Sequence, residues 1–220
     1  MLDSKAFRTL SYGLYVIATK VDGKTSGCTV NTFEQLTSQP YQVSVAVNKE
    51  NYTCSAIKKA GKYTAIVLAE ETTMEFIGTF GFHSSSEMDK FEGYTTEVDE
   101  AGMPYIAEHA VARFSVDVTN TLDVGTHMLF VGTVTEAEVY GSTNPMTYSY
   151  YHEVKGGKTP PKASSYIIEE EEVITMSNES TQKAWRCTIC GHTEYADELP
   201  DDFECPVCGA GKESFELVED

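Results

Sequence analysis

Residues 187–209 read CTICGHTEYADELPDDFECPVCG and decide the fold of the last part of this 220-residue chain. Cys187-x-x-Cys190 and Cys205-x-x-Cys208 place four thiolates at the spacing that wraps two tight loops around one ion. Four sulfur ligands indicate zinc or iron. The spacing alone leaves both open: a zinc ribbon with a structural role, or an iron site that carries electrons.

The residues around the four cysteines favour iron. Gly191 and Gly209 each follow the second cysteine of a pair, where positive φ lets backbone N–H groups point at sulfur and tune a reduction potential. Four aromatic residues are expected to form a small core that keeps water from the metal: Trp185, Tyr195, Phe203 and Phe215.

The stretch from Trp185 to Glu219 resembles a rubredoxin, the one-iron, four-cysteine electron carrier. Only 14 residues separate the two cysteine pairs, whereas most rubredoxins have a longer insert there. The resemblance implies that all four cysteines bind one iron ion that cycles between the ferric and ferrous states.

The charge of the chain excludes some classes of partner. A formal net charge of −18 opposes binding to nucleic acid or to an anionic membrane surface. No run of 18 apolar residues and no export signal is visible, so we expect a cytoplasmic protein. Cys28 and Cys54 stand outside the metal pairs and are interpreted as small buried residues rather than redox groups.

A change in composition divides the chain. An acidic run followed by a Ser-, Asn-, Thr- and Gln-rich stretch lies around residues 168–184. We therefore expect a large domain over residues 1–168, a linker over 169–182 and a small domain over 183–220. Residues 1–182 hold 13 basic and 24 acidic residues, a net of −11, which leaves −7 for the remainder.

The large domain is predicted to be mainly β. Strands are expected over residues 41–48, 63–69, 111–119 and 128–140, which alternate apolar and polar positions or are rich in β-branched residues. Helices are expected from about Thr53 to Gly61, and from residue 71 to a stop at Gly78 or Gly81. Short strands with few helices between them favour an antiparallel barrel or sandwich.

A possible phosphate site lies at residues 47–61, VNKENYTCSAIKKAG. A strand ends in Asn48, and the chain passes Lys49 and Asn51 to reach Thr53 at a helix start. Free backbone N–H groups, a hydroxyl and a lysine at a helix N-terminus suit a phosphate. The alternative is an ordinary N-cap beside a surface lysine.

Four ordered segments resemble the flavin reductase-like, FMN-binding split-barrel family: residues 27–53, 76–91, 123–134 and 150–166. The resemblance implies that Asn31 and Thr32 contact the polar edge of the flavin. It also implies a set of residues near the phosphate and ribityl chain: Asn48, Lys49, Asn51, Thr53, Ser84 and Ser85. His127 corresponds to the histidine beside the flavin where nicotinamide stacks. Tyr151 and His152 are candidates to close the pocket.

The two resemblances together imply one pathway for electrons. Nicotinamide releases two electrons as hydride, a single iron accepts one, and a flavin can exchange either number. The whole chain resembles the high-molecular-weight rubredoxins of anaerobic microbes, which implies FMN and one iron as cofactors and NADH or NADPH as donor. It also implies a homodimer and a flavodiiron protein, a reductase of oxygen or nitric oxide, as acceptor. The alternative is a flavin or ferric reductase whose four-cysteine module binds structural zinc and serves in protein interaction.

Overall fold

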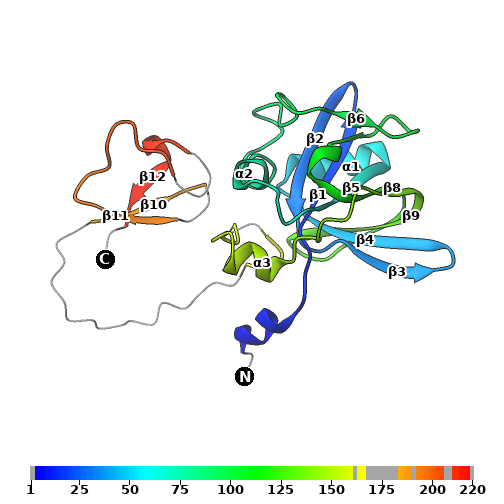
Figure 1. The fold of residues 1–220 in the computed structure, drawn as a ribbon, viewed down its shortest axis with the longest axis horizontal. Helices are drawn as coiled ribbons and strands as arrows, with labels where there is room; N and C mark the ends of the chain where they lie inside the picture. Colours follow the sequence, from blue (N-terminus) through cyan, green and yellow to red (C-terminus); the bar gives the residue numbers. More distant parts are fainter. Residues whose placement is uncertain (1–2, 161–162, 167–182, 190–191, 206–209, 219–220) are drawn as a thin grey trace.

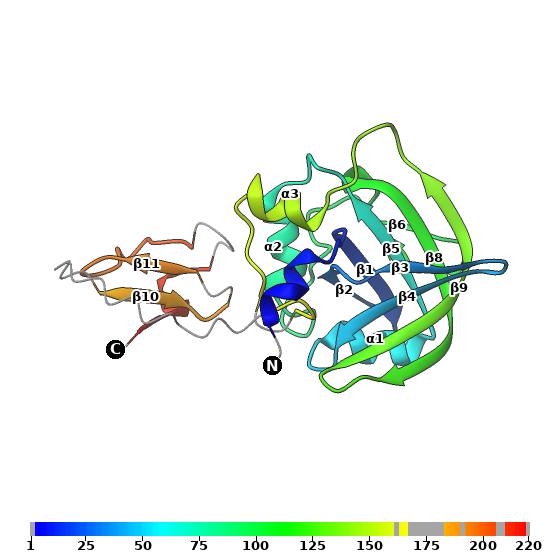
Figure 2. The ribbon, with the colours of Figure 1, turned by 90° about the horizontal axis from the view of Figure 1, so that it is seen from below.

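A computed structural model describes residues 3–160, 163–166, 183–189, 192–205 and 210–218. The expected linker over 169–182 and the ligands Cys190 and Cys208 lie outside the described residues. Seven antiparallel strands form one sheet in the order β2-β1-β5-β8-β9-β4-β3, which curls into an open barrel (Figures 1 and 2). The strands are β1 (Tyr15–Val21), β2 (Lys24–Val30), β3 (Glu34–Ser38), β4 (Tyr41–Asn48), β5 (Lys62–Leu68), β8 (Ala110–Asp123) and β9 (His127–Val139). The predicted split β-barrel is confirmed.

The barrel is split because the two ends of this strand order, β2 and β3, do not pair with each other among the described residues. All four predicted strands are present, as β4, β5, β8 and β9. Strands β1, β2 and β3 were not predicted. Strand β2 is largely polar, and all five residues of β3 are exposed, so neither carries the apolar alternation that reveals a strand.

Helix α1 (Tyr52–Ala60) lies where a helix was expected and ends at Gly61, whose φ of 66° suits glycine. Helix α2 (Met74–Phe82) differs from the expectation, because it continues through Gly78 and past Gly81 to Phe82. Its apolar side chains pack against the sheet, and this burial outweighs the low helix propensity of the two glycines. A third helix, α3 (Tyr148–Glu153), was not predicted.

Two apolar clusters hold the large domain together. Inside the barrel, Ile57 of α1 packs with Ile17 and Val45 of the strands. On the other side of β1, Phe76 and Phe80 of α2 pack with the buried strand residues of the second cluster. Both sides of the central strands are therefore covered, one by α1 and the other by α2.

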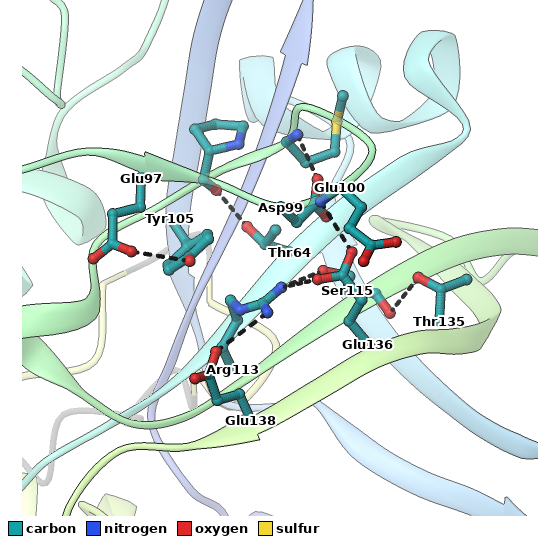
Figure 3. A network of polar contacts seen from close by, with 12 residues as sticks. Thr64, Glu97, Asp99, Glu100, Tyr105, Arg113, Ser115, Thr135, Glu136 and Glu138 are labelled. Carbon is teal, nitrogen blue, oxygen red and sulfur yellow. Dashed lines mark hydrogen bonds and ion pairs between the residues drawn. The ribbon is translucent and has the colours of Figure 1, made fainter.

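A buried arginine fastens a small hairpin to the sheet (Figure 3). The hairpin consists of β6 (Glu97–Val98) and β7 (Pro104–Tyr105). Arg113 is 6% exposed, donates to Glu136 Oε2 at 3.0 Å and to Ser115 Oγ at 2.7 Å, and lies 4.6 Å from the centre of the Tyr105 ring. Loss of such a buried partner typically costs about 3–5 kcal/mol.

The small domain has a three-stranded sheet in the order β11-β10-β12, formed by β10 (Ala184–Cys187), β11 (Thr193–Tyr195) and β12 (Phe215–Leu217). Short 3₁₀ helices occur at η1 (Ser4–Thr9), η2 (Ala107–His109) and η3 (Lys212–Ser214). Within the described ranges, no helix has both the length and the apolar character needed to cross a membrane.

Candidate functional site

A cavity of about 530 Å³ lies at the split of the barrel. Its walls come from β2 and β4, from the start of β9, from the end of α2 and from α3. The predicted site residues Asn31, Asn48, Asn51, Ser84 and His127 all line it, although they are spread over almost 100 positions of sequence. Small-molecule sites typically measure about 300–1,000 Å³, so the cavity can hold a cofactor-sized ligand.

The N-terminus of α1 forms one end of this cavity. Asn51 caps the helix by accepting a hydrogen bond from the Thr53 backbone N–H at 3.0 Å, and Asn48 Oδ1 accepts from the Glu50 N–H at 2.9 Å. The Thr53 hydroxyl is fully buried and has no oxygen or nitrogen partner among the described residues, and the Cys28 thiol lies beside it. An unsatisfied hydroxyl at the positive end of a helix is suited to an anionic ligand.

Lys49 points to a different partner. Its Nζ lies 2.5 Å from Asp123 Oδ1 and 2.6 Å from Oδ2, and its side chain is 37% exposed. The lysine also holds the pKa of the Asp123 carboxyl below its usual range. Asn51 and Lys49 thus form the predicted alternative, an N-cap beside a surface lysine. The assignment of Thr53 to a phosphate stays a prediction, because Thr53 does not line the cavity.

Asn31 is buried, lines the cavity and is held by a distant segment. Its Nδ2 donates to Ser165 Oγ at 2.7 Å, and its Oδ1 accepts from Ser164 Oγ at 3.0 Å. Ser165 Oγ also donates to the Tyr148 hydroxyl at 3.2 Å. Residues 163–165 therefore close one side of the cavity, a contact that joins positions more than 130 residues apart.

His127 is the first residue of β9 and is 9% exposed. Its ring nitrogen Nδ1 lies 2.9 Å from Thr126 Oγ1, and in the sheet register it faces Asn48. Gly132, five positions along the same strand, has no room for a side chain against Val116, which keeps β8 and β9 close. The ring is thus held in the cavity wall by a rigid pair of strands.

Two predicted site residues, Thr32 and Ser85, have other roles in this structure. Thr32 Oγ1 donates to the Ala46 carbonyl at 3.1 Å, and Ser85 hydrogen-bonds the backbone of Gly27. Neither Thr32 nor Ser85 lines the cavity, whereas Ser84 does. Their assignment as cofactor contacts stays a prediction.

Tyr151 and His152, the two candidates from α3, have different positions relative to the cavity. Tyr151 is buried, lines the cavity and donates to the Lys158 carbonyl at 3.0 Å. His152 lies behind it, with Nδ1 2.7 Å from the Gly157 carbonyl oxygen and Nε2 3.3 Å from Thr159 Oγ1. Tyr151 forms the wall, and His152 supports the segment that follows.

A buried cation lies next to the cavity wall. Lys90 is 1% exposed, and its Nζ donates to the Gly27 carbonyl at 3.0 Å and to the Phe80 carbonyl at 3.1 Å. Burial lowers the pKa of Lys90 to about 8 and raises the pKa of the neighbouring Cys28 thiol to about 11. Cys28 is therefore a protonated, buried thiol, in agreement with its predicted structural role.

Cys187 and Cys205 of the small domain have matching burial and matching backbone hydrogen bonds. Cys187 and Cys205 are 1% and 2% exposed. The Cys187 N–H donates to the carbonyl of His192 at 2.7 Å, and the Cys205 N–H donates to the carbonyl of Ala210 at 2.8 Å. In both cases the cysteine N–H bonds to the residue five positions later, a spacing that suits two cysteine knuckles around one metal.

Around these loops, three of the four predicted aromatic residues form the expected shell. Phe203 and Phe215 meet edge to face with ring centres 5.2 Å apart, and Trp185 Nε1 donates to the Ala196 carbonyl at 3.0 Å. Tyr195 was wrongly expected in this core, because its side chain is 64% exposed. Leu199, 1% exposed, occupies the interior instead.

The two sites fit the groups that the sequence implied. The large cavity is bordered by the N-terminus of α1, at Asn48 and Asn51, and by the buried amide of Asn31, polar groups that suit the phosphate and the polar ring edge of a flavin. Thr53 itself does not line the cavity. The small domain presents buried thiols, and thiolates select iron or zinc. Tyr148, Ser164 and Ser165 were not predicted as site residues. Only the two serines had a signal in the sequence, because they lie in residues 150–166, a segment that resembles the flavin reductase-like family.

Two families match separate parts of the chain. Residues 7–156 match the flavin reductase like domain, and residues 185–216 match the rubrerythrin, rubredoxin-like domain. Among solved structures, an FMN-binding protein of Thermus thermophilus superposes with a TM-score of 0.56 at 21% identity, over 60% of this chain and 73% of that protein. An NADH:FAD oxidoreductase of Streptomyces globisporus does so with a TM-score of 0.59 at 23% identity, over 66% and 86%. These similarities establish the barrel fold.

Two curated relatives are closer in sequence. The high molecular weight rubredoxin of Moorella thermoacetica is 40% identical, over 99% of this chain and all of that protein. The ferric-chelate reductase (NAD(P)H) of Archaeoglobus fulgidus is 46% identical, over 76% of this chain and 98% of that protein. The first relative thus matches both domains, and the second covers a smaller share of this chain.

Proposed function

Because the chain belongs to the flavin reductase like family and also carries a rubredoxin-like domain, we propose that it delivers electrons from NAD(P)H to a second redox protein. It is an NAD(P)H-dependent flavoprotein oxidoreductase with FMN and one iron as its cofactors. The similarity of the complete chain to a high molecular weight rubredoxin, over both domains, is the observation that carries this function.

When bound, FMN takes up a hydride and gives up electrons singly, so it links nicotinamide to the one-electron iron site. We assign the phosphate end to the α1 N-terminus, with the Thr53 hydroxyl and the helix dipole as the main attractive groups. Asn31 is assigned to the polar edge of the ring system. His127 is placed to position the nicotinamide, and Ser84 to contact the ribityl chain.

We assign the iron to Cys187, Cys190, Cys205 and Cys208. The matching backbone hydrogen bonds of Cys187 and Cys205 support this assignment. Phe203, Phe215 and Leu199 exclude water from the described side of the site.

A homodimer is part of the proposal. Strand β3 is exposed along its whole length, and the β3–β4 hairpin projects from the barrel (Figure 2). Leu36 and Tyr41 in this hairpin are 46% and 63% exposed. Apolar side chains on a projecting hairpin favour coverage by a second copy of the chain.

A flavodiiron protein in the cytoplasm is the acceptor that we propose. The net charge of −7 on residues 183–220 suits docking onto a basic surface of such a partner. Free ferric chelates are the competing acceptor, because the Archaeoglobus relative is named for that reaction.

Anaerobic titration of the purified protein with NADH tests the function. We expect stoichiometric bleaching of the flavin and ferric-sulfur absorption bands, with one iron and one FMN per chain by analysis. Zinc in place of iron in protein from native cells, or a flavin that stays oxidised, would refute it. Steady-state turnover with a flavodiiron protein and with ferric citrate then identifies the preferred acceptor.

A further inference from the structure

The small domain contacts the large domain beside the cavity. Phe82, the last residue of α2, packs against the apolar core of the small domain together with Ile189. Figures 1 and 2 both show α2 and α3 on the side of the barrel that faces the small domain. Ile189 lies between two of the predicted metal ligands, Cys187 and Cys190.

The loop that holds the metal ligands also forms part of the cavity wall. Thr188 and Ile189 line the cavity together with His83, Ser84 and Pro160 of the large domain. The cysteine loop and the candidate flavin residues therefore border the same space.

A polar contact also joins the two domains, in addition to the apolar contact of Phe82. Lys158 Nζ lies 3.1 Å from His192 Nδ1, and His192 Nε2 lies 3.3 Å from Glu194 Oε2. The backbone carbonyl of Lys158 accepts a hydrogen bond from Tyr151 in the cavity wall, so the position of the lysine is tied to the cavity. Both parts of the chain carry net negative charge and repel each other, which makes a cation at the contact favourable.

We propose that Phe82, His83, Lys158 and Pro160 form a docking patch on which the chain seats its own small domain for electron delivery. In this position the Thr188–Ile189 loop lies at the cavity mouth, and Lys158 is the positioning residue. Electron transfer between two cofactors falls steeply with distance, so the patch shortens the gap between the flavin cavity and the cysteine loop. The inference rests on the proposed function, since it concerns how that function's two sites meet.

The single tryptophan of the chain provides a direct measurement of docking. Trp185 lies in β10 of the small domain, and its fluorescence can transfer energy to FMN. In protein loaded with FMN and with zinc at the cysteine site, the Trp185 lifetime reports the distance between the domains without NADH or turnover. We expect Lys158→Glu to lengthen the lifetime and to lower the transfer efficiency at least twofold.

The matched control is Lys20→Glu, which makes the same charge change at an exposed position of β1. It is expected to leave the lifetime as in the unsubstituted protein. Phe82→Ala removes the apolar half of the contact and is expected to lengthen the lifetime independently of Lys158. Equal lifetimes for the unsubstituted protein, Lys158→Glu and Phe82→Ala would overturn the proposal, and so would an efficiency that falls on tenfold dilution, because that indicates docking between separate molecules.

Rapid mixing of the iron-loaded protein with NADH separates this inference from the proposed function. In Lys158→Glu we expect reduction of the flavin at the unsubstituted rate, followed by reduction of the iron at a rate at least fivefold lower. If the iron step is as fast as in Lys20→Glu, the docking proposal is wrong although the function stands. If the unsubstituted protein fails to reduce its flavin or its iron, the proposed function is wrong, and the lifetimes still decide whether the domains dock.

Discussion

Asn31 Nδ2 donates a hydrogen bond of 2.7 Å to Ser165 Oγ, joining the end of strand β2 to a segment 134 residues later. The bond closes one side of the cavity and fixes the amide that we assign to the polar edge of the flavin. Asn31→Ala removes both the amide and the closure, whereas Ser165→Ala removes only the closure.

We therefore expect Asn31→Ala to weaken FMN binding about tenfold and Ser165→Ala about threefold, in line with one to two lost hydrogen bonds. Flavin titration of the apoprotein, followed by fluorescence quenching, measures both. An Asn31→Ala variant that binds FMN as tightly as the unsubstituted protein would remove this residue from the site.

Thr53→Val is expected to weaken FMN binding about 10- to 100-fold, because a hydrogen bond to a charged phosphate contributes about 1.5–3 kcal/mol. The stability of the apoprotein should not fall, since the buried Thr53 hydroxyl has no oxygen or nitrogen partner in the part of the chain that the structure describes. Isothermal titration with FMN and urea unfolding measure the two effects.

The matched control for this variant is Thr73→Val at the start of α2. Thr73 Oγ1 accepts a hydrogen bond from the Phe76 N–H at 3.2 Å, so its loss should cost about 1 kcal/mol of stability and leave FMN binding unchanged. If Thr53→Val also lowers stability but not affinity, Thr53 is a structural residue.

His127→Asn is expected to slow flavin reduction by NADH about tenfold, equivalent to ~1.4 kcal/mol in the barrier. The FMN content should be retained, because we assign the histidine to the nicotinamide side. Thr126→Ala removes the 2.9 Å contact to Nδ1 and should have a smaller effect in the same direction. Stopped-flow absorbance gives the rates, and an unchanged rate in His127→Asn would contradict the assignment.

The buried Lys90 should make stability depend on pH. Its pKa is lowered to about 8 in the folded state, so between pH 8 and about 10.4 the unfolded chain binds more protons and the free energy of unfolding rises with pH. The slope contributed by this one group is at most about 1.4 kcal/mol per pH unit. The free energy of unfolding of the Lys90→Met variant should not show this rise with pH.

The Cys28 thiol has the opposite effect on the free energy of unfolding at pH values above its ordinary pKa. Burial raises the pKa of this thiol to about 11, so the folded chain keeps a proton that the unfolded chain loses. Subtracting the urea unfolding curves of Lys90→Met from those of the unsubstituted protein at each pH isolates the lysine. A difference that stays flat from pH 7 to 10 would show that Lys90 titrates normally.

Strands with a strong apolar pattern could be predicted from the sequence. Elements whose formation depends on contacts between distant residues could not. Strands β4, β5, β8 and β9 carry strong apolar patterns. Strand β3 is exposed on both faces, so its residues give no pattern. Helix α2 passes two glycines because burial of Phe76 and Phe80 outweighs local propensity.

The same distinction applies to the site. Asn48, Asn51 and Thr53 lie close together in sequence, and a local motif predicted them as a group. Ser165 and Lys158 act through partners that only the fold brings near, and Lys49 is held by Asp123, 74 positions away. A sequence motif does not indicate contacts between residues that lie far apart in the chain.

Rapid anaerobic mixing of the iron- and FMN-loaded protein with NADH tests the central claim most directly. We predict that the flavin absorption band falls first and the ferric band follows, at a rate that does not change when the protein is diluted. A ferric band that persists after the flavin is reduced, or that falls before it, would contradict the account.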